Sequence, residues 1–279
     1  MKTTYFAMIL SLEATTLSAL SLPPFVTNLW GPWMPDTGDN WQSVFDGPFK
    51  FPKSLDPDIS VYGLDLWSNN KPTVKKLQKS GKHVICSFSG GTVKLSDPDR
   101  KIFVKKDIGT QTDLPNGEKW VNVKSRGVRK TIAKRVKLAA DKGCNAISPR
   151  NTNAYDLDTG FNLSEDDEID YIEFLADEAA KYHMSIGVDI GAIAIDLQDI
   201  VSFFIGGTCD DSSGDIDGSD GDDDSDGGDD SDGGDGSDES GDNSWESEDP
   251  NSCDFWQGLM DFGIPVFSTD GGDFKKPKI

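Results

Sequence analysis

Short apolar runs of strand length alternate with helix-like segments along most of the chain. Apolar or β-branched runs bounded by turn residues predict strands, whereas apolar residues three and four positions apart predict helices. This alternation is typical of an α/β fold with a parallel sheet. The eight strand candidates are 41–45, 59–66, 83–89, 120–123, the run from Asn145, 185–189, 200–205 and 264–268. Eight such units in 279 residues predict one (β/α)8 TIM barrel.

Helix signals lie between several of these runs. Residues 72–80 begin with a proline and are followed by Gly81, the order expected for a helix start and a helix stop. Residues 126–142 are basic and carry apolar positions at helical spacing. A capping-box pair, Ser164 and Asp167, begins a third helix. The predicted helices therefore join strands that are consecutive along the chain.

The segment Asn145 to Tyr155 is the most informative for function. It begins as a short apolar strand and opens at once into a polar loop that contains Pro149. In an α/β barrel the chemistry lies where strands end and loops begin. The side chains at this junction therefore decide whether the barrel is an enzyme.

The net charge of −22 comes mostly from one tract, residues 210–249, which holds 19 of the 49 acids and no Lys or Arg. The rest of the chain carries 27 cations and 30 acids, a net charge of −3, so it has no basic footprint for nucleic acid. The tract is almost entirely Asp, Ser and Gly, which predicts disorder. Asp222 to Gly227 match the opening of a calcium loop, but its last ligand is missing. The tract is either a solvated loop or a weak binder of divalent cations.

The chain has four cysteines and two histidines, without a C-x-x-C pair or an H-E-x-x-H motif. We therefore expect neither a metal site nor a cofactor. Cys209 and Cys253 bracket the acidic tract and predict a disulfide at its base in a secreted protein. Cys86 and Cys144 either pair or remain buried thiols.

The N-terminus has one lysine followed by a short apolar run, Tyr5 to Leu12, with small residues downstream. This pattern predicts a secretory signal peptide, because a bilayer span needs about 18 or more apolar residues. The alternative is a hydrophobic N-terminal segment that is retained. We expect a secreted monomer, extracellular or in the cell wall, with no membrane partner. Asn162 begins an N-glycosylation sequon.

Several segments together resemble glycoside hydrolase family 114, the endo-α-1,4-polygalactosaminidase-like barrels. They are Trp41-Gln42, Val61 to Leu66, Gly81 to Gly91, Lys142 to Ile147, Asn151 to Tyr155, Thr159 to Leu163, and Cys209 with Cys253. The resemblance implies a TIM barrel that hydrolyses O-glycosyl bonds in a polysaccharide containing galactosamine or galactose. Together with the N-terminal pattern, it divides the chain into a signal peptide (1–21), a barrel (30–209 and 251–275) and an acidic insertion (210–250).

The chain departs from the family pattern where acids are expected. The family's E/D-P-D-N reads Ser148-Pro149-Arg150-Asn151, and its N-E-Q-C reads Gly206-Gly207-Thr208-Cys209. Glycoside hydrolysis ordinarily needs two carboxyl groups that flank the scissile bond. Arg150 replaces one of them by a cation and Gly207 supplies no side chain. The substitutions predict impaired or lost hydrolysis.

Other polar and aromatic residues remain as candidates at the predicted strand ends. The catalytic candidates are Asp65, Asp189 and Asp270; the substrate-binding candidates are Asn151, Tyr155, Trp41 and Trp120. Each has a structural alternative: Asp65 would hydrogen-bond within the mouth, Asp189 would pair with Arg150, and the tryptophans would be core.

Three hypotheses follow. The first is a sugar-binding barrel with impaired hydrolysis. The second is an active α-glycosidase that uses relocated carboxylates, with Asp65 and either Asp189 or Asp270 as the pair. The third is a non-catalytic cell-wall protein that acts through its acidic tract.

Overall fold

The computed structural model describes residues 31–112, 117–155, 157–189, 193–206, 253–261 and 263–268. All helices and strands belong to one compact unit, Pro32–Ile279. The signal peptide predicted at 1–21, the acidic insertion at 210–250 and the predicted Cys209–Cys253 disulfide lie outside the described residues or depend on side chains that are not described. No helix of the described part is long and apolar enough to cross a bilayer.

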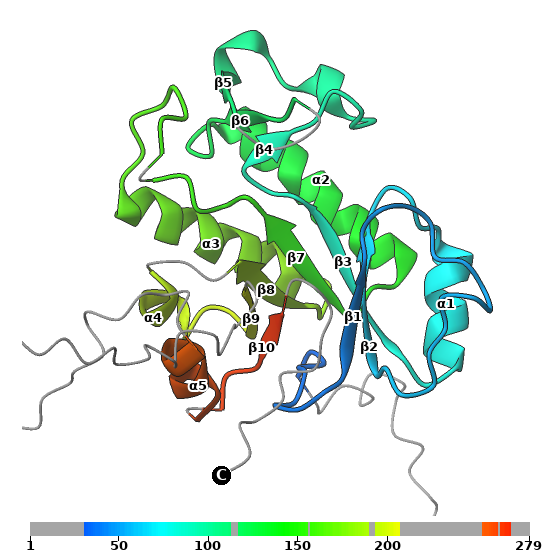
Figure 1. Cartoon of the computed structure of the whole chain (residues 1–279). Helices are drawn as coiled ribbons and strands as arrows, with labels where there is room; N and C mark the ends of the chain where they lie inside the picture. Colours follow the sequence, from blue (N-terminus) through cyan, green and yellow to red (C-terminus); the bar gives the residue numbers. More distant parts are fainter. Residues whose placement is uncertain are drawn as a thin grey trace, which may run out of the picture. The chain divides into compact units, whose positions relative to one another are not determined.

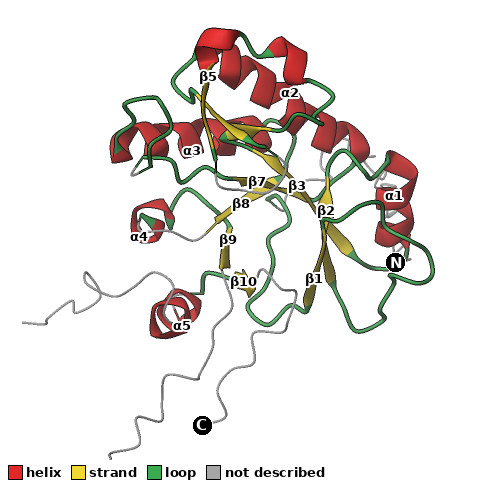
Figure 2. Ribbon diagram, turned by 45° about the horizontal axis from the view of Figure 1, so that its top comes forward, coloured by secondary structure: helices red, strands yellow, loops and turns green. Residues whose placement is uncertain are grey.

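Seven parallel strands form the central sheet of the described structure (Figures 1 and 2). In sheet order they are β1 (Trp41–Val44), β2 (Val61–Asp65), β3 (His83–Ser89), β7 (Ala146–Arg150), β8 (Ser185–Asp189), β9 (Phe203–Gly206) and β10 (Val266–Ser268). The two edge strands meet through side chains: the Trp41 indole N–H donates to the Ser268 carbonyl at 2.7 Å, and the Trp41 and Phe267 rings stack at 5.0 Å. The sheet is a near-closed, TIM-barrel-like cylinder, as the alternation predicts.

The strand expected at 120–123 is not a barrel strand. It appears as β6 (Lys119–Val121), which pairs antiparallel with β4 (Thr92–Val93) and β5 (Ile108–Gln111) in a separate three-stranded sheet. The prediction of a barrel strand there is wrong because β3 pairs directly with β7, Ile85 opposite Ala146, and leaves no place between them. Two short 3-10 helices, η2 (Arg100–Ile102) and η3 (Lys105–Asp107), complete this small sheet region.

The helices lie outside the ring of strands (Figure 2). They are α1 (Lys71–Lys79), α2 (Arg126–Lys142), α3 (Glu165–Ala180), α4 (Ala194–Leu197) and α5 (Cys253–Asp261). The predicted capping box is confirmed, since the Ser164 and Asp167 side chains each accept from the other's backbone N–H. Gly143, with φ of 92°, ends α2 in the left-handed conformation that glycine adopts without strain. These caps fix where each helix returns the chain to the barrel.

Strand alternation arranges the barrel interior in layers. The lower part of the interior is apolar and forms one buried cluster: Trp41, Val61, Ile85, Ala146, Phe203, Ile205 and Phe267. Glycines make room for its largest rings, because a Cβ on Gly63 would lie 2.5 Å from the Trp41 ring and one on Gly187 would lie 2.0 Å from the Phe203 ring. The floor of the barrel is therefore packed, and only its upper end remains for a site.

A disulfide between Cys86 and Cys144 joins β3 to the turn after α2, with the two Cα atoms 5.9 Å apart. Cys86 precedes Ser87, which belongs to the inward-facing set, so its sulfur faces the helices. This pairing decides the alternative that the sequence left open for these two cysteines. Disulfides persist in oxidising compartments.

Candidate functional site

The upper layer of the barrel is polar. On β3 and β7, the inward residues two positions beyond the apolar floor are Ser87 and Ser148. The inward residues at the carboxyl ends of the strands are Asp65, Ser89, Arg150 and Asp189. These residues stand at the carboxyl ends of β2, β3, β7 and β8, the edge at which barrel enzymes place their sites. Parallel pairing in register thus brings together residues that are far apart in sequence.

A cavity of about 780 Å³ opens above this layer. It is lined by Phe45 and Asp46 after β1, by Asp65 and Trp67 at the end of β2, and by the loop Lys94 to Asp97, Glu118, Arg150 and Asn151. A volume of this size lies within the range of about 300–1,000 Å³ that small-molecule sites occupy. The cavity combines charged groups with aromatic faces, as a sugar site requires.

Asp65 is the half-buried carboxylate of this cavity, and it lies where the sequence predicts it. Its Oδ1 accepts a hydrogen bond from the Ser68 N–H at 2.7 Å. This single bond leaves the other carboxylate oxygen without a hydrogen bond inside the described part of the chain. Asp65 can therefore accept a hydrogen bond from a ligand.

Glu118 is a site residue that sequence reasoning missed. Its side chain is 6% exposed and lines the cavity from the small sheet. Its Oε2 accepts from Thr92 at 2.6 Å, from Asn151 at 3.0 Å and from Ser89 at 3.4 Å, and its Oε1 pairs with Lys94 at 3.0 Å. These four partners fix the position of the Glu118 side chain. The detectable signal was a lone acid two residues before Trp120, but only the antiparallel pairing of β4 with β6 carries it to the mouth.

Asn151 joins two carboxylates. Its side-chain amide donates to Glu118, and its backbone N–H donates to Asp189 Oδ2 at 3.2 Å. It adopts φ of 58°, a left-handed conformation that asparagine tolerates better than most residues. Gly91 permits this geometry, because a Cβ there would lie 2.0 Å from the Asn151 carbonyl oxygen. The Gly90–Gly91 pair after β3 is therefore required by the loop after β7.

Burial raises the pKa of the Asp189 carboxyl above its ordinary value, and the Asn151 N–H and the charge of Arg150 oppose this rise. A carboxyl with a raised pKa retains its proton to higher pH. Asp189 is not among the residues that line the cavity, although it lies directly behind Asn151. It is therefore a supporting group at the mouth.

Arg150 lies inside the cavity, with its guanidinium 4.8 Å from the centre of the Phe45 ring. Its Nε is buried and has no hydrogen-bond partner among the described residues, and Arg150 forms no ion pair with Asp189 there. A buried donor without an acceptor is unfavourable by about 1–3 kcal/mol. The Arg150 side chain as a whole is half-buried, so its charge is offered to a ligand in the cavity.

The structure places the aromatic candidates away from the cavity. Trp41 is 1% exposed and belongs to the barrel floor, and Trp120 is 7% exposed within the small sheet, so neither ring offers a face to a sugar. Tyr155 packs against the main hydrophobic core. Trp67 and Phe45, which the sequence did not single out, supply the aromatic surface of the cavity. Asp270 and Gly207 lie outside the described residues.

Comparisons with known proteins agree with this architecture. The profile of the glycoside-hydrolase family GH114 matches residues 23–221. The structure is similar to that of Ega3 from Aspergillus fumigatus in complex with galactosamine, at 28% identity over 90% of this chain and 84% of Ega3, with a TM-score of 0.67. The glycoside hydrolase domain of PelA from Pseudomonas aeruginosa matches at 12% identity over 63% of this chain and 71% of that domain, with a TM-score of 0.48. No curated protein matches the sequence.

Proposed function

Because the chain belongs to glycoside-hydrolase family GH114, we propose that its barrel mouth binds a polysaccharide containing galactosamine or galactose while hydrolysis is impaired or lost. The observation that carries the proposal is Arg150, a cation inside the cavity at the end of β7, where the family pattern has an acid. The complex of Ega3 with galactosamine supports the class of sugar.

Hydrolysis of a glycosidic bond passes through an oxocarbenium-like transition state that two carboxyl groups normally flank. Arg150 puts positive charge beside this developing cation and favours the ionised form of neighbouring acids, which opposes proton donation. Glu118 is ion-paired with Lys94 and almost fully buried, so it has little access to a leaving oxygen. This leaves Asp65 and the exposed Asp46 as the accessible carboxylates of the described cavity.

The same groups suit binding. Arg150 offers a half-buried cation, Asp65 offers an acceptor oxygen, and Trp67 and Phe45 offer faces for the C–H side of a sugar ring. Such a site orients a pyranose by a few hydrogen bonds over an apolar surface. Binding requires none of the missing acids.

Isothermal titration calorimetry with a galactosamine oligosaccharide, together with a reducing-end assay, tests the proposal. We expect binding that Asp65→Asn and Arg150→Ala each weaken, with no release of reducing ends. Lys130→Gln is a matched control, because Lys130 is exposed on α2 and lines neither cavity described here. Robust hydrolysis that Asp65→Ala abolishes would refute the proposal.

One observation favours the second hypothesis, an active glycosidase with relocated carboxylates. Glu118 and Asp189 are both hydrogen-bonded to Asn151; Glu118 is ion-paired with Lys94, and burial raises the pKa of Asp189. This resembles the division between a base and an acid. Asp65 and Asp270 remain the other candidates for such a pair. If reducing ends are released and both Glu118→Gln and Asp189→Asn abolish the release, this second function replaces the first.

We also propose that the protein is secreted, as the predicted signal peptide implies. The Cys86–Cys144 disulfide supports an oxidising compartment. Immunodetection of the protein in the culture medium, with an N-terminus beyond residue 21, tests this.

A further inference from the structure

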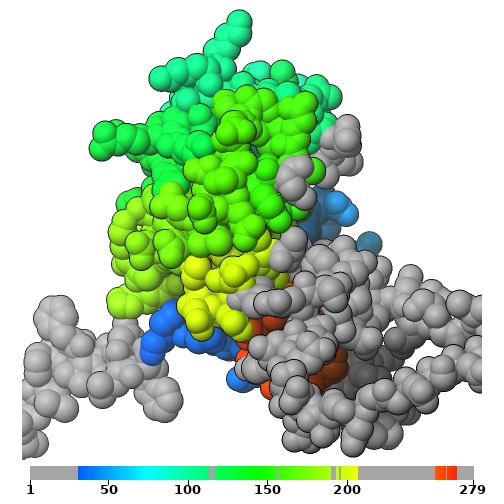
Figure 3. All heavy atoms as spheres, turned by 90° about the vertical axis from the view of Figure 1, so that its left-hand side faces the viewer, coloured from blue at the N-terminus to red at the C-terminus, as the bar shows by residue number. Residues whose placement is uncertain are grey.

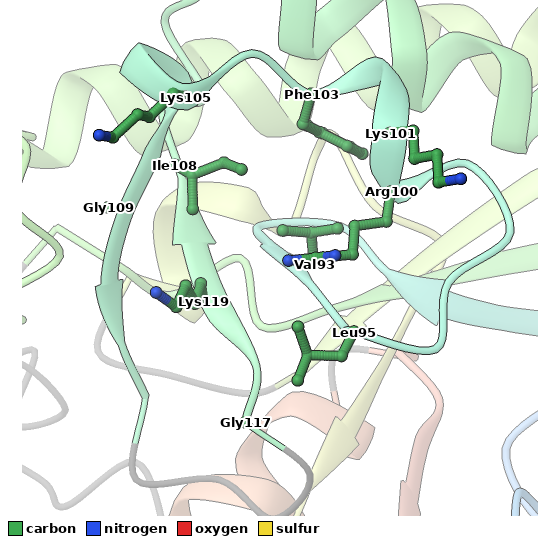
Figure 4. Close-up of a pocket in the computed structure, with 10 residues that line it drawn as sticks. All are labelled: Val93, Leu95, Arg100, Lys101, Phe103, Lys105, Ile108, Gly109, Gly117 and Lys119. Atoms are coloured by element: carbon green, nitrogen blue, oxygen red, sulfur yellow. The ribbon is translucent and has the colours of Figure 1, made fainter.

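A second cavity, of about 410 Å³, lies on the other side of the small antiparallel sheet (Figure 4). Four cations surround it: Arg100, Lys101, Lys105 and Lys119. Its apolar surface includes Val93 and Phe103, which are 3% and 7% exposed. No Asp or Glu lines it among the described residues. The cavity is thus apolar at its base and positively charged around it.

The small antiparallel sheet lies between this cavity and the barrel mouth, and successive residues of β4 and β6 face opposite sides of it. Val93 and Lys119 are register partners in β4 and β6 and face the second cavity, whereas their neighbours Lys94 and Glu118 face the mouth. Leu95, which is 60% exposed, lines both cavities. The two cavities therefore adjoin at Leu95.

The four cations are available for a ligand. None of them forms an ion pair or a side-chain hydrogen bond with any residue in the described ranges, whereas Lys94 pairs with Glu118 and Arg135 pairs with Asp97 and Asp99. All four are exposed, and Figure 3 shows long side chains of this teal-to-green part of the chain projecting from the surface. Residues 92–142 hold 14 Lys and Arg against 6 Asp and Glu, a net charge of +8 in a chain of net charge −22. The fold thus concentrates its cations in this region.

We propose that the second cavity binds the carboxylate-bearing sugars of an acidic polysaccharide, as an extension of the barrel mouth. Arg100 and Lys119 contact the carboxylate, and the exposed side chain of Leu95 packs against the ring. This proposal depends on the proposed sugar-binding function in one respect: the polysaccharide is taken to run from the barrel mouth into the second cavity. Continuity with the mouth over Leu95 favours a saccharide over an acidic peptide as the occupant.

Calorimetric titration of the full chain with an oligogalacturonate and with a neutral galactose oligomer of equal length tests this proposal. We expect the acidic oligomer to bind more tightly, with an affinity that falls as salt is raised from 50 to 200 mM, because partly exposed ion pairs are screened. Arg100→Gln combined with Lys119→Gln should weaken its binding roughly tenfold, the scale of two partly exposed ion pairs. Lys130→Gln should leave its affinity within error of wild type.

Asp65→Asn distinguishes binding at this second cavity from binding at the barrel mouth. If the proposed mouth function fails but this site exists, the acidic oligomer still binds, and Asp65→Asn leaves its affinity unchanged. Equal affinities for the two oligomers, or no effect of the double Gln variant, would overturn the proposal. So would binding of a synthetic peptide of residues 210–249 at this cavity without binding of oligogalacturonate. Unchanged melting temperatures of the variants exclude misfolding as the cause.

Discussion

Arg135 offers the sharpest test of how the cavity is supported. This side chain on α2 is 1% exposed, and its guanidinium donates to Asp97 Oδ2 at 3.0 Å, to both Asp99 carboxylate oxygens at 2.7 and 2.8 Å, and to the Ser89 carbonyl at 2.7 Å. Asp97 lies in the loop that lines the mouth, and Ser89 ends β3. One buried cation therefore fixes helix, strand and loop to one another.

Arg135→Met keeps the apolar stem and removes the charge. The Asp97 carboxylate is 3% exposed and loses its buried partner, whereas Asp99 is 14% exposed and regains some water. Breaking a buried ion pair by removing one partner costs about 3–5 kcal/mol, and the partial exposure of Asp99 puts the expected loss near the lower end, about 3 kcal/mol. Chemical denaturation followed by circular dichroism at pH 7 measures it.

The loss should depend on pH. Burial already raises the pKa of Asp97, and Arg135 opposes this rise, so the variant's Asp97 has a still higher pKa. An acid whose folded pKa exceeds its unfolded pKa destabilises the fold more as pH rises between the two values. The deficit of Arg135→Met should therefore shrink between pH 7 and pH 4.5, and Asp97→Asn in the same chain should recover part of it.

Lys137→Met on the same helix is the control, because its pair with Asp141 is exposed on both sides and should leave the free energy of unfolding close to that of the wild type. A loss below about 1 kcal/mol for Arg135→Met, or a loss that is independent of pH, would show that the ion pairs of Arg135 with Asp97 and Asp99 do not stabilise the fold in this way.

Three further perturbations test other parts of the described structure. Gly91→Ala places a Cβ 2.0 Å from the Asn151 carbonyl oxygen, so we expect a lower melting temperature and weaker sugar binding; an unchanged melting curve would contradict the close approach. Replacing Cys86 and Cys144 together by Ala should lower the free energy of unfolding by about 2–4 kcal/mol, with no further effect of reductant on the variant. Asp189→Asn should stabilise the fold at pH 7 but not at pH 4, because the raised pKa of Asp189 favours its protonated form; a stability difference that does not change with pH would argue against this.

The fold could be predicted from local patterns, because strand runs, helix spacing and caps are encoded in consecutive residues. Asp65 and Asn151 were found at the mouth because barrel chemistry lies at the carboxyl ends of strands. Glu118 was not found, because its place depends on an antiparallel pairing that no local pattern specifies. For the same reason Trp120 was counted as part of a barrel strand.

The aromatic residues show a second limit. Trp41 and Trp67 are the same residue type near neighbouring strands, yet one plugs the barrel floor and the other lines the cavity. Whether a ring faces inward low or high in a barrel depends on the register between strands, not on its own sequence neighbourhood. Composition therefore identifies sugar-stacking candidates without telling them apart.

In the described residues, the joint between β1 and β10 is made by the Trp41 indole and ring stacking, where every other neighbouring pair of barrel strands shares a backbone ladder. A ladder fixes spacing at about 4.8 Å, whereas a side-chain latch tolerates a range of separations. The cylinder therefore has one seam that side chains, not backbone hydrogen bonds, hold together. The circumference of the cylinder can vary at this one seam without the loss of a backbone hydrogen bond between the described strands.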